Sequence, residues 1–433
     1  MGGLQQQIES FLLGSDALKL LSERLQENRL RAWLVGGAIR DLLLERPVTD
    51  VDIATSDDPT LLVKDWSAEV SGRWFWLDAE RKQCRVLLSD NLTVDFAPLR
   101  AGSIEEDLLL RDFTINSLAF PIDASQDRPA SLLDQFDGQQ HIEERLLVPC
   151  SKRSFLDDPL RLLKGIRHAV TLNMEISPDC FEQMQLKASL IGRVAGERIR
   201  DELGKIFAGD KALDGIRLLL RTGILAALFG PAGSSWEEGR AFDSLRRLWD
   251  QIRTIQQKIE QEMNEDGREE VFPQKAVFLL AKLIELYAPH NLPDLLHKKL
   301  RLSRHQQKLI QALQQHPGPQ WIARAATVND SRQQALLVEQ LGFAPTEQLI
   351  YLSLTENELL FKHAILLSHA FRKHQVCGRV PDLIDGDQLE YLLRGRPKHE
   401  IGIWQNHLKV AEIAGEISST RDATTWLLQQ LSI

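Results

Sequence analysis

Apolar and polar positions alternate in two different ways along the chain. Residues 30–125 contain short apolar runs bounded by turn residues, a pattern typical of strands. The runs are AWLVGG, GRWFWLD, CRVLLSD and LTVDFAPL. Between them, residues 38–45 and 59–66 place apolar side chains at helical spacing. This part of the sequence therefore predicts a mixed α/β unit around one small sheet.

Helical spacing begins near residue 155 and continues almost to the end. Apolar side chains in residues 160–170 form one stripe, and later segments repeat this amphipathic pattern without a fixed period. Those segments are DGIRLLLRTGILAALF, KAVFLLAKLIELYA and HAILLSHAFRKH. Boundaries are expected near Pro149, near Gly209 and within 316–333. The predicted fold class is α+β, with a mixed-sheet head followed by an all-α remainder.

Composition narrows the class of protein. At 433 residues the chain is long for one core and is expected to form two to four domains. No apolar run of about 18 residues is present, so no membrane span is expected, and the first residues lack the features of a secretory signal. The four cysteines include no CxxC pair, which indicates neither a zinc site nor a disulfide framework. We expect a protein of the reducing cytoplasm.

The net charge of −9 argues against a protein that coats nucleic acid indiscriminately. It does not exclude a nucleic-acid enzyme, because contact with phosphates depends on local basic surface. Three basic segments are present: HKKLRLSRH (297–305), FRKH (371–374) and RGRPKH (394–399). Each is either a solvated helix face or an RNA contact, and the sequence leaves both interpretations open.

The segment with the clearest chemistry is a strand, two glycines and a helix, followed by an acidic pair. Gly36 and Gly37 allow close approach of a phosphate to the backbone, and the helix start offers free N–H groups. In Asp50-Val51-Asp52, the period of a strand places both carboxylates on one face. Such like charges favour a cation between them, and carboxylate oxygens suit Mg²⁺. Two such ions can activate an attacking hydroxyl and stabilise a leaving pyrophosphate.

An isolated Asp-x-Asp is usually a polar strand edge, but its position after the glycine turn is more specific. Asp95 lies in a later predicted strand and can bring a third carboxylate to the same sheet face. The catalytic candidates are therefore Asp50, Asp52 and Asp95, with Asp50 and Asp52 as the metal ligands.

With these residues in place, the segment LVGGAIRDLLLERPVTDVDIATS resembles the first motif of the class II tRNA nucleotidyltransferases and bacterial poly(A) polymerases. Four further segments resemble the family's later motifs in order: 111–116, 133–138, 157–161 and 197–203. The last 50 residues resemble the family tail less specifically. The implied domains are a head with the catalytic sheet (1–145), a neck for base recognition (146–208), an RNA-binding body (209–330) and a tRNA-binding tail (331–433).

The resemblance also implies a role for each matching residue. Asp50 and Asp52 would hold metal ions, Arg111 and Arg40 would contact the triphosphate, and Asp112 would accept from the ribose hydroxyl. Asp158 and Arg161 would present an acceptor and a donor to the base's Watson–Crick edge. The implied nucleotide-binding residues are Gly36, Gly37, Arg40, Arg111, Asp112, Asn116, Asp158, Arg161, Lys164 and Arg167.

Spacing supports the base-reading pair, since Asp158 and Arg161 are three residues apart and would share one face of a helix. The alternative is a surface ion pair worth about 0.3–0.5 kcal/mol. The sequence departs from the family pattern at three positions. Leu110 replaces a second arginine, Asp157 replaces a glutamate, and Lys164 replaces an arginine, keeping the charge but losing the planar fork.

The interval between Asp95 and Arg111 bears on which nucleotides are added. It has only 15 residues, most of them used by a strand end and by the helical stretch SIEEDLLL, where Ser103 and Glu106 predict a capping box. Relatives that complete the CCA end carry a longer flexible segment here. By resemblance, this chain adds cytidines from CTP to tRNA and stops before the final adenosine, which a separate A-adding enzyme supplies.

Several alternatives remain open at this stage. The nearest is a full CCA-adding enzyme that uses CTP and ATP, and a poly(A) polymerase is less favoured. Two alternatives belong to other classes of protein. The chain could be an inactive RNA-binding protein or a nucleotidylyltransferase that modifies protein. In the favoured interpretation, Mg²⁺ is the cofactor, and the helical half holds the acceptor and TΨC arms of tRNA through their phosphates.

Overall fold

The computed structural model describes residues 2–89, 92–122, 130–263, 275–287, 295–315, 317–355, 358–360, 383–394, 396–397 and 399–431. The chain forms two compact units, Met1–Leu228 and Phe229–Ile433, each taken by itself below. The basic segment 371–374 and the helix expected over 363–374 lie outside the described residues, and the basic segment 394–399 lies partly outside them.

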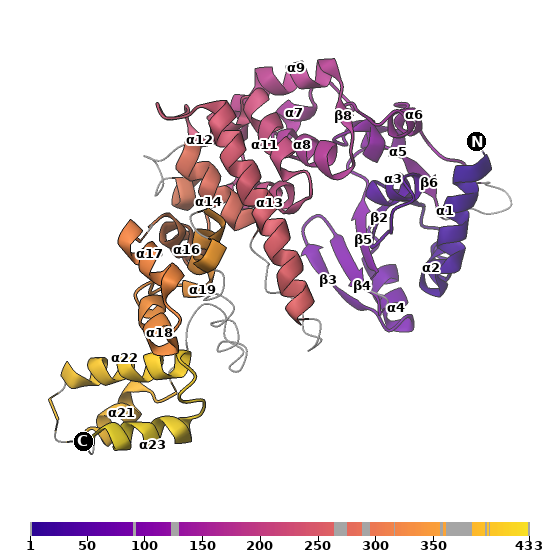
Figure 1. Cartoon of the computed structure of the whole chain (residues 1–433). Coiled ribbons are helices and arrows are strands. Elements are labelled where there is room, and N and C mark those ends of the chain that lie inside the picture. The colour runs from indigo at the N-terminus through magenta and orange to yellow at the C-terminus, as the bar shows by residue number, and fades with distance from the viewer. Residues whose placement is uncertain are drawn as a thin grey trace. The chain divides into compact units, whose positions relative to one another are not determined.

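The first unit is built on a six-stranded mixed sheet, in the order β3-β4-β5-β2-β1-β6. Figure 1 shows β3, β4, β5 and β2 within it. β2 and β5 are parallel and the other neighbours antiparallel. The strands are β1 (Ala32–Val35), β2 (Asp50–Thr55), β3 (Arg73–Asp78), β4 (Gln83–Leu87), β5 (Thr93–Pro98) and β6 (Ala119–Pro121). Each of the four apolar runs forms a strand, so the predicted sheet is confirmed.

Helices cover this sheet and fix its acidic edge. α3 (Gly37–Leu43) packs against β1 and β2, and α4 (Thr60–Glu69) against β3 and β4. α5 (Ile104–Leu109) packs through Ile104 and Leu108 onto Trp33 and Val35. Because Val35 pairs with Asp52 across the sheet, α5 lies on the face that carries Asp52. α1 (Gly2–Gly14) and α2 (Asp16–Glu27) precede the sheet, and α2 contacts α4.

The rest of the first unit is mostly helical. α8 (Arg161–Thr171) packs against α10 and α11 through a fully buried stripe that includes Leu162, Leu163 and Ile166. The remaining elements are α6 (Gly138–Glu143), α7 (Ser154–Asp157), α9 (Pro178–Lys187), α10 (Gly196–Ala208), α11 (Ala212–Arg221), α12 (Ile224–Phe229), β7 (Leu146–Leu147), β8 (Glu175–Ile176), η1 (Thr114–Asn116) and η2 (Ala188–Arg193). The amphipathic segment 214–229 is split, because Gly223 adopts φ +74° between α11 and α12.

The regular elements described in the second unit are helical, which confirms the all-α prediction for this part of the chain. They are α13 (Glu238–Met263), α14 (Lys275–Tyr287), the π-helical turn η3 (Leu295–Lys299), α16 (Arg304–Gln314), α17 (Pro319–Thr327), α18 (Ser331–Glu339), α19 (Pro345–Thr355), η4 (Glu358–Leu360), α21 (Gly386–Leu392), α22 (His399–Ile413) and α23 (Thr420–Leu431). The last three pack around a shared apolar cluster that includes Leu389, Leu408 and Leu427. None of the helices in the described ranges is long and apolar enough to cross a bilayer.

Gly138 lies where α6 approaches the segment that follows Arg111, and it yields a stability prediction. A Cβ at this position would lie 2.5 Å from the Thr114 carbonyl oxygen, a backbone atom that cannot rotate away. We expect Gly138→Ala to lower the free energy of unfolding by about 1–3 kcal/mol, measured by urea denaturation. Gly204→Ala in α10 is the control, since no described atom lies within 4 Å of its Cβ. Alanine there should stabilise by up to about 1 kcal/mol, and equal destabilisation of both variants would contradict the steric argument.

Candidate active site

The acidic pair lies on β2 as the sequence predicted. Asp50 and Asp52 are exposed, whereas Val51 between them is 1% exposed. Although Asp52 is exposed, protein atoms packed around its carboxylate partly desolvate it and raise its pKa. The Arg111 guanidinium opposes this, and the neighbouring carboxylates of Asp95 and Asp50 raise the pKa further. A divalent cation at this position would remove that repulsion, and the donors are the carboxylate oxygens that Mg²⁺ prefers. The residues present therefore fit a metal ion.

Asp95 lies beside the pair but is already bound. It is in register with Asp52 on the neighbouring strand, as expected for a third carboxylate on this face. Both of its oxygens accept from Arg85 on β4, at 2.6 and 2.7 Å, in a bidentate pair. Within the described residues, no three His, Cys, Asp or Glu side chains form a group that could hold a metal. An ion between Asp50 and Asp52 would therefore complete its coordination with oxygens from water or substrate, as Mg²⁺ commonly does.

Gly36 makes room for the charges above the pair. Its φ of +76° lies in the left-handed region that favours glycine. A Cβ on Gly36 would lie 2.9 Å from Asp52 Oδ2 and 3.2 Å from Arg111 Nη1. The glycine thus brings the start of α3, a carboxylate and a guanidinium to one point. A Cβ on Gly37 would similarly lie 3.1 Å from Nη2 of the Arg40 guanidinium.

Arg111 is held by Asp107, a residue that the sequence motifs did not single out. Asp107 on α5 is 2% exposed and accepts from Arg100 Nε at 2.8 Å, Arg100 Nη2 at 2.9 Å and Arg111 Nη2 at 3.3 Å. Two guanidinium groups therefore share one carboxylate, and the trio keeps a net positive charge next to Asp52. Arg111 Nε is buried with no partner among the described residues. The four-residue spacing of Asp107 and Arg111 was the available sequence signal.

The turn before α5 is short and tightly bonded. Ser103 caps the helix by accepting from Glu106 N at 3.2 Å, as predicted. The second half of the predicted capping box is wrong, because the Glu106 carboxylate accepts from Gly102 N at 3.0 Å rather than from Ser103 N. Together with the bonds of Arg100 to Asp107, these contacts fix the whole connection between β5 and α5.

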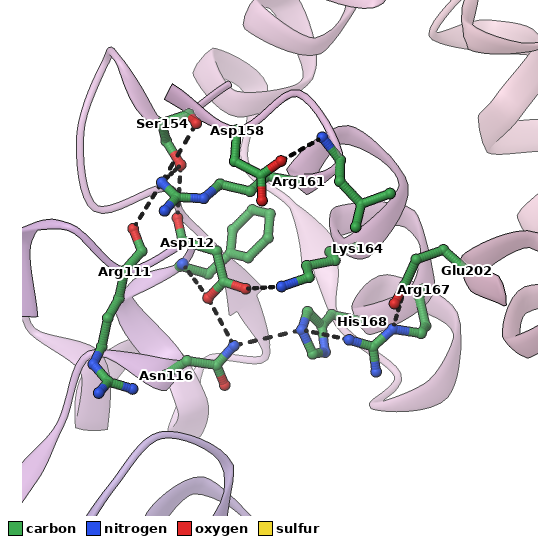
Figure 2. Close-up of polar contacts among 12 residues, drawn as sticks. Arg111, Asp112, Asn116, Ser154, Asp158, Arg161, Lys164, Arg167, His168 and Glu202 are labelled. Atoms are coloured by element: carbon green, nitrogen blue, oxygen red, sulfur yellow. Dashed lines mark hydrogen bonds and ion pairs between the residues drawn. The ribbon is translucent and has the colours of Figure 1, made fainter. Parts of the chain in front are cut away.

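A second polar cluster joins the sheet region to α8 (Figure 2). Asn116 donates to Asp112 Oδ1 at 3.0 Å and lies 3.4 Å from His168 Nε2, while Lys164 Nζ is 3.9 Å from Asp112 Oδ2. Desolvation alone would raise the pKa of Asp112, but the positive charge of Lys164 and hydrogen bonds from the Asn116 amide and the Phe113 N–H hold it below its usual value. Burial holds the pKa of His168 well below its usual value, so the ring is neutral. Arg40 is 9% exposed and donates to Asn116 Oδ1 at 2.7 Å.

Arg40 and Arg167 are both engaged in ion pairs in this structure. Arg40 binds both oxygens of Asp41, at 3.0 and 2.8 Å, in addition to Asn116. Arg167 donates from Nε to Glu202 at 2.7 Å (Figure 2). Both side chains border the second cluster. Arg40 reaches it through Asn116, and Arg167 Nη2 lies 3.4 Å from His168 Nε2.

The expected helical pair of Asp158 and Arg161 is wrong in its geometry. Asp158 lies in an extended turn after α7, with φ −141°, and Arg161 is the first residue of α8, so they do not share a helix face. The proline between them disfavours helical backbone at Asp158. Asp158 instead pairs with Arg198 at 3.0 Å. Arg161 donates to the carbonyl oxygen of Leu110 at 2.5 Å. It also donates to the carbonyl oxygen of Arg111 at 3.1 Å and to Ser154 Oγ at 3.0 Å (Figure 2).

The structure thus gathers the predicted residues into two clusters and an edge. The first cluster lies at the sheet and contains Asp50, Asp52, Gly36 and Arg111. The second cluster contains Lys164 of α8 together with Asp112, Asn116 and Arg40. Asp158 and Arg161 lie at the edge of the second cluster. The site residues that the sequence did not predict are Arg85, Arg100, Asp107 and His168. Arg198 and Glu202 lie in the motif 197–203, for which no role of single residues was predicted.

Comparison with known proteins identifies the family to which the chain belongs. The description "Poly A polymerase head domain" matches residues 32–148, and "Probable RNA and SrmB- binding site of polymerase A" matches residues 173–236. A CC-adding tRNA nucleotidyltransferase of Geobacter sulfurreducens is 31% identical over 95% of this chain and 94% of its own length. A CCA-adding enzyme of Streptococcus suis is 33% identical over 51% of this chain and 56% of its own length.

A solved structure shares the fold. The Thermotoga maritima CCA-adding enzyme complexed with tRNA matches 95% of this chain and 94% of its own length, with a TM-score of 0.64 and 21% identity. The full-length relative and the family match to the head domain decide the classification. The chain belongs to the tRNA nucleotidyltransferase and poly(A) polymerase family and is an enzyme that transfers nucleotides to the 3′ end of RNA.

Proposed function

We propose that this enzyme adds cytidines from CTP to the 3′ end of tRNA and stops before the terminal adenosine. The observation that carries the chemistry is the acidic pair on β2 facing Arg111 across Gly36. The observation that carries the choice of nucleotide is the fixed connection between β5 and α5, where Arg100 bonds Asp107 through its backbone N, Nε and Nη2. A connection held in this way has little freedom to reshape the pocket from CTP to ATP.

Relatives support the proposal without deciding it. The full-length match is a CC-adding enzyme, while the matches of about half the chain include CCA-adding enzymes. The solved relative with tRNA supports tRNA as the RNA substrate, and another in complex with CTP supports the nucleotide. A full CCA-adding enzyme is the alternative, with ATP as the second nucleotide. The domain division at residues 145, 208 and 330 also remains a proposal.

In the proposed mechanism, Asp50 and Asp52 would hold Mg²⁺, which when bound would lower the pKa of the attacking RNA 3′-hydroxyl and neutralise charge on pyrophosphate. Arg111 binds the triphosphate, and Asp107 holds its guanidinium toward Gly36 so that little reorganisation is needed. Gly36 and Gly37 let the backbone approach the phosphates. Asp112, whose pKa Lys164 and its hydrogen bonds hold below the usual value, accepts as a carboxylate from the ribose hydroxyl. Asn116 positions that carboxylate.

Reading the base requires a local rearrangement of the edge residues. Asp158 and Arg161 are bound to Arg198 and to backbone carbonyls, so they must exchange these partners to meet cytosine. Lys164 and Arg167 lie one and two turns along α8 and are proposed to line the same pocket. We also propose a cytoplasmic location, which the three described cysteines support as buried free thiols.

The catalytic assignment predicts a complete loss of activity when one carboxylate is removed. Asp52→Ala should abolish CMP incorporation into tRNA while leaving tRNA affinity unchanged, because the substitution removes a metal ligand and no RNA contact. Incorporation and tRNA binding are measured on the same preparation. Asp65→Ala, which removes the same charge from an exposed position on α4, is the control. Full activity of Asp52→Ala would overturn the assignment.

The Asp107 contact predicts a change in nucleotide affinity. Asp107→Asn keeps the size of the side chain but removes the charge that positions Arg111, so KM for CTP should rise about tenfold, or about 1.4 kcal/mol. Steady-state kinetics with saturating tRNA measure the change, and the melting temperature confirms that the variant is folded. Glu105→Gln on the exposed side of α5 is the control. An unchanged KM in folded Asp107→Asn would show that Arg111 does not depend on Asp107 for its position.

The nucleotide choice predicts the length of the product. With tRNA that lacks its CCA end, the enzyme should add two cytidines in CTP alone and extend no further when ATP is supplied. With tRNA ending in CC, ATP should give no product. A CCA-adding enzyme on the same RNAs serves as the positive control, and products are resolved at single-nucleotide length. Efficient addition of the terminal adenosine would replace the CC-adding proposal with the CCA-adding alternative.

A further inference from the structure

α8 buries a polar side chain that the proposed mechanism does not use. His168 is 4% exposed and lies among apolar residues of the same helix, such as Ile166 and Ala169. The Phe113 ring packs edge-on against the imidazole, with 5.9 Å between the two centroids, and holds its plane. A polar group buried this deeply needs hydrogen-bond partners, and those partners indicate what the histidine does.

Two donors approach the same nitrogen of the ring. Asn116 Nδ2 and Arg167 Nη2 each lie 3.4 Å from His168 Nε2 (Figure 2). An amide nitrogen and a guanidinium nitrogen can only donate, so Nε2 must accept and the ring proton must be on Nδ1. Burial lowers the pKa of His168 and keeps the ring in the neutral form that this arrangement requires.

The other bonds of Asn116 fix which way its amide faces. Oδ1 accepts from Arg40 Nη1 at 2.7 Å, which turns Nδ2 toward Asp112 and His168. The two hydrogens of Nδ2 are then divided between Asp112 Oδ1, at 3.0 Å, and His168 Nε2. Without an acceptor at position 168, one buried N–H would lose its partner, and the amide would be free to turn away from Asp112.

The bonds around Asp112 leave one of its oxygens for a ligand. Oδ1 accepts from Phe113 N at 2.8 Å as well as from Asn116. Lys164 Nζ is 3.9 Å from Oδ2, beyond hydrogen-bond distance. Oδ2 therefore keeps the capacity to accept from a hydroxyl, and the donors that hold Oδ1 determine where it points.

We propose that His168 is a positioning residue, which holds Asn116 and through it Asp112 in the orientation that selects ribonucleotides over deoxyribonucleotides. The proposal rests on the proposed function in that CTP is the nucleotide and Asp112 accepts from its ribose hydroxyl. dCTP lacks the 2′-hydroxyl, so it gains nothing from a correctly directed Oδ2. The contribution of His168 is therefore specific to CTP.

The test compares His168→Phe with His168→Gln in the full-length enzyme. Phenylalanine keeps a ring against Phe113 but cannot accept a hydrogen bond, whereas the glutamine carbonyl oxygen can replace Nε2 as an acceptor. With saturating tRNA that lacks its CCA end, His168→Phe should raise KM for CTP about 10-fold. KM for dCTP and kcat with either nucleotide should stay nearly unchanged, so the preference for CTP falls by the same factor. His168→Gln should recover most of that preference.

Two further variants control for packing. His141 Nδ1 lies 2.9 Å from Thr114 Oγ1, so His141→Phe alters a histidine that contacts η1 through Thr114 rather than Asn116, and it should leave the preference for CTP nearly unchanged. His168→Leu also lacks the acceptor but differs in shape from phenylalanine, so the result does not depend on the fit of one side chain. Melting temperatures identify which variants are folded.

An unchanged preference for CTP in folded His168→Phe or His168→Leu would overturn the proposal. So would equal losses in His168→Phe and His168→Gln, or activity that falls alike with CTP and dCTP, because both results would indicate that His168 only supports the fold. Calorimetric binding of CTP and dCTP without RNA tests His168 independently of transfer. If the unmodified enzyme binds CTP better than dCTP but transfers no CMP to tRNA, the proposed function fails, while the binding ratio in the variants still decides the role of His168.

Discussion

The site depends on keeping like charges close together on one face of β2. Asp50, Asp52 and Asp95 would repel one another in a bare sheet, and the protein offsets this in two different ways. Arg85 neutralises Asp95 with a bidentate pair, whereas Asp52 keeps a raised pKa beside the half-buried Arg111. The least neutralised part of the cluster is therefore the pair to which we assign the metal. The charge imbalance that destabilises the protein at this point is the one a cation would relieve.

Arg161 links the chemistry on the sheet to the helices that follow it. Its guanidinium bonds the carbonyls of Leu110 and Arg111, and the Asp112 carbonyl accepts from Ser154 Oγ at 3.0 Å. Any movement of α8 would therefore be transmitted to the backbone that carries Arg111 and Asp112. The same contacts explain how a departure such as Leu110 is tolerated, because Arg161 uses the backbone carbonyl of residue 110 and not its side chain.

Much of the fold could be predicted because local pattern and tertiary environment agree. The period-two alternation of β2 predicted the shared face of Asp50 and Asp52, and the glycine turn before α3 was recognisable from its residues. Contacts across the sheet were harder to predict. Arg85 faces Asp95 only because β4 and β5 pair in one register, and a shift of one residue would have turned Arg85 to the other face. Asp158 was misplaced because its spacing to Arg161 was interpreted as helical, while Pro159 keeps Asp158 in a turn.

The Arg100–Asp107 pair connects phosphate binding with nucleotide choice in the proposed enzyme. Asp107 is 2% exposed, so without Arg100 its buried carboxylate would depend on Arg111 for compensation of its charge. Arg111 would then be fully neutralised by Asp107 and less available to a triphosphate. Because Arg100 must stay bonded for Arg111 to keep its net charge, the connection between β5 and α5 cannot open without weakening the phosphate site. In a chain built this way, opening the connection would leave the charge of Arg111 offset by Asp107 alone, which favours one fixed pocket and one kind of nucleotide.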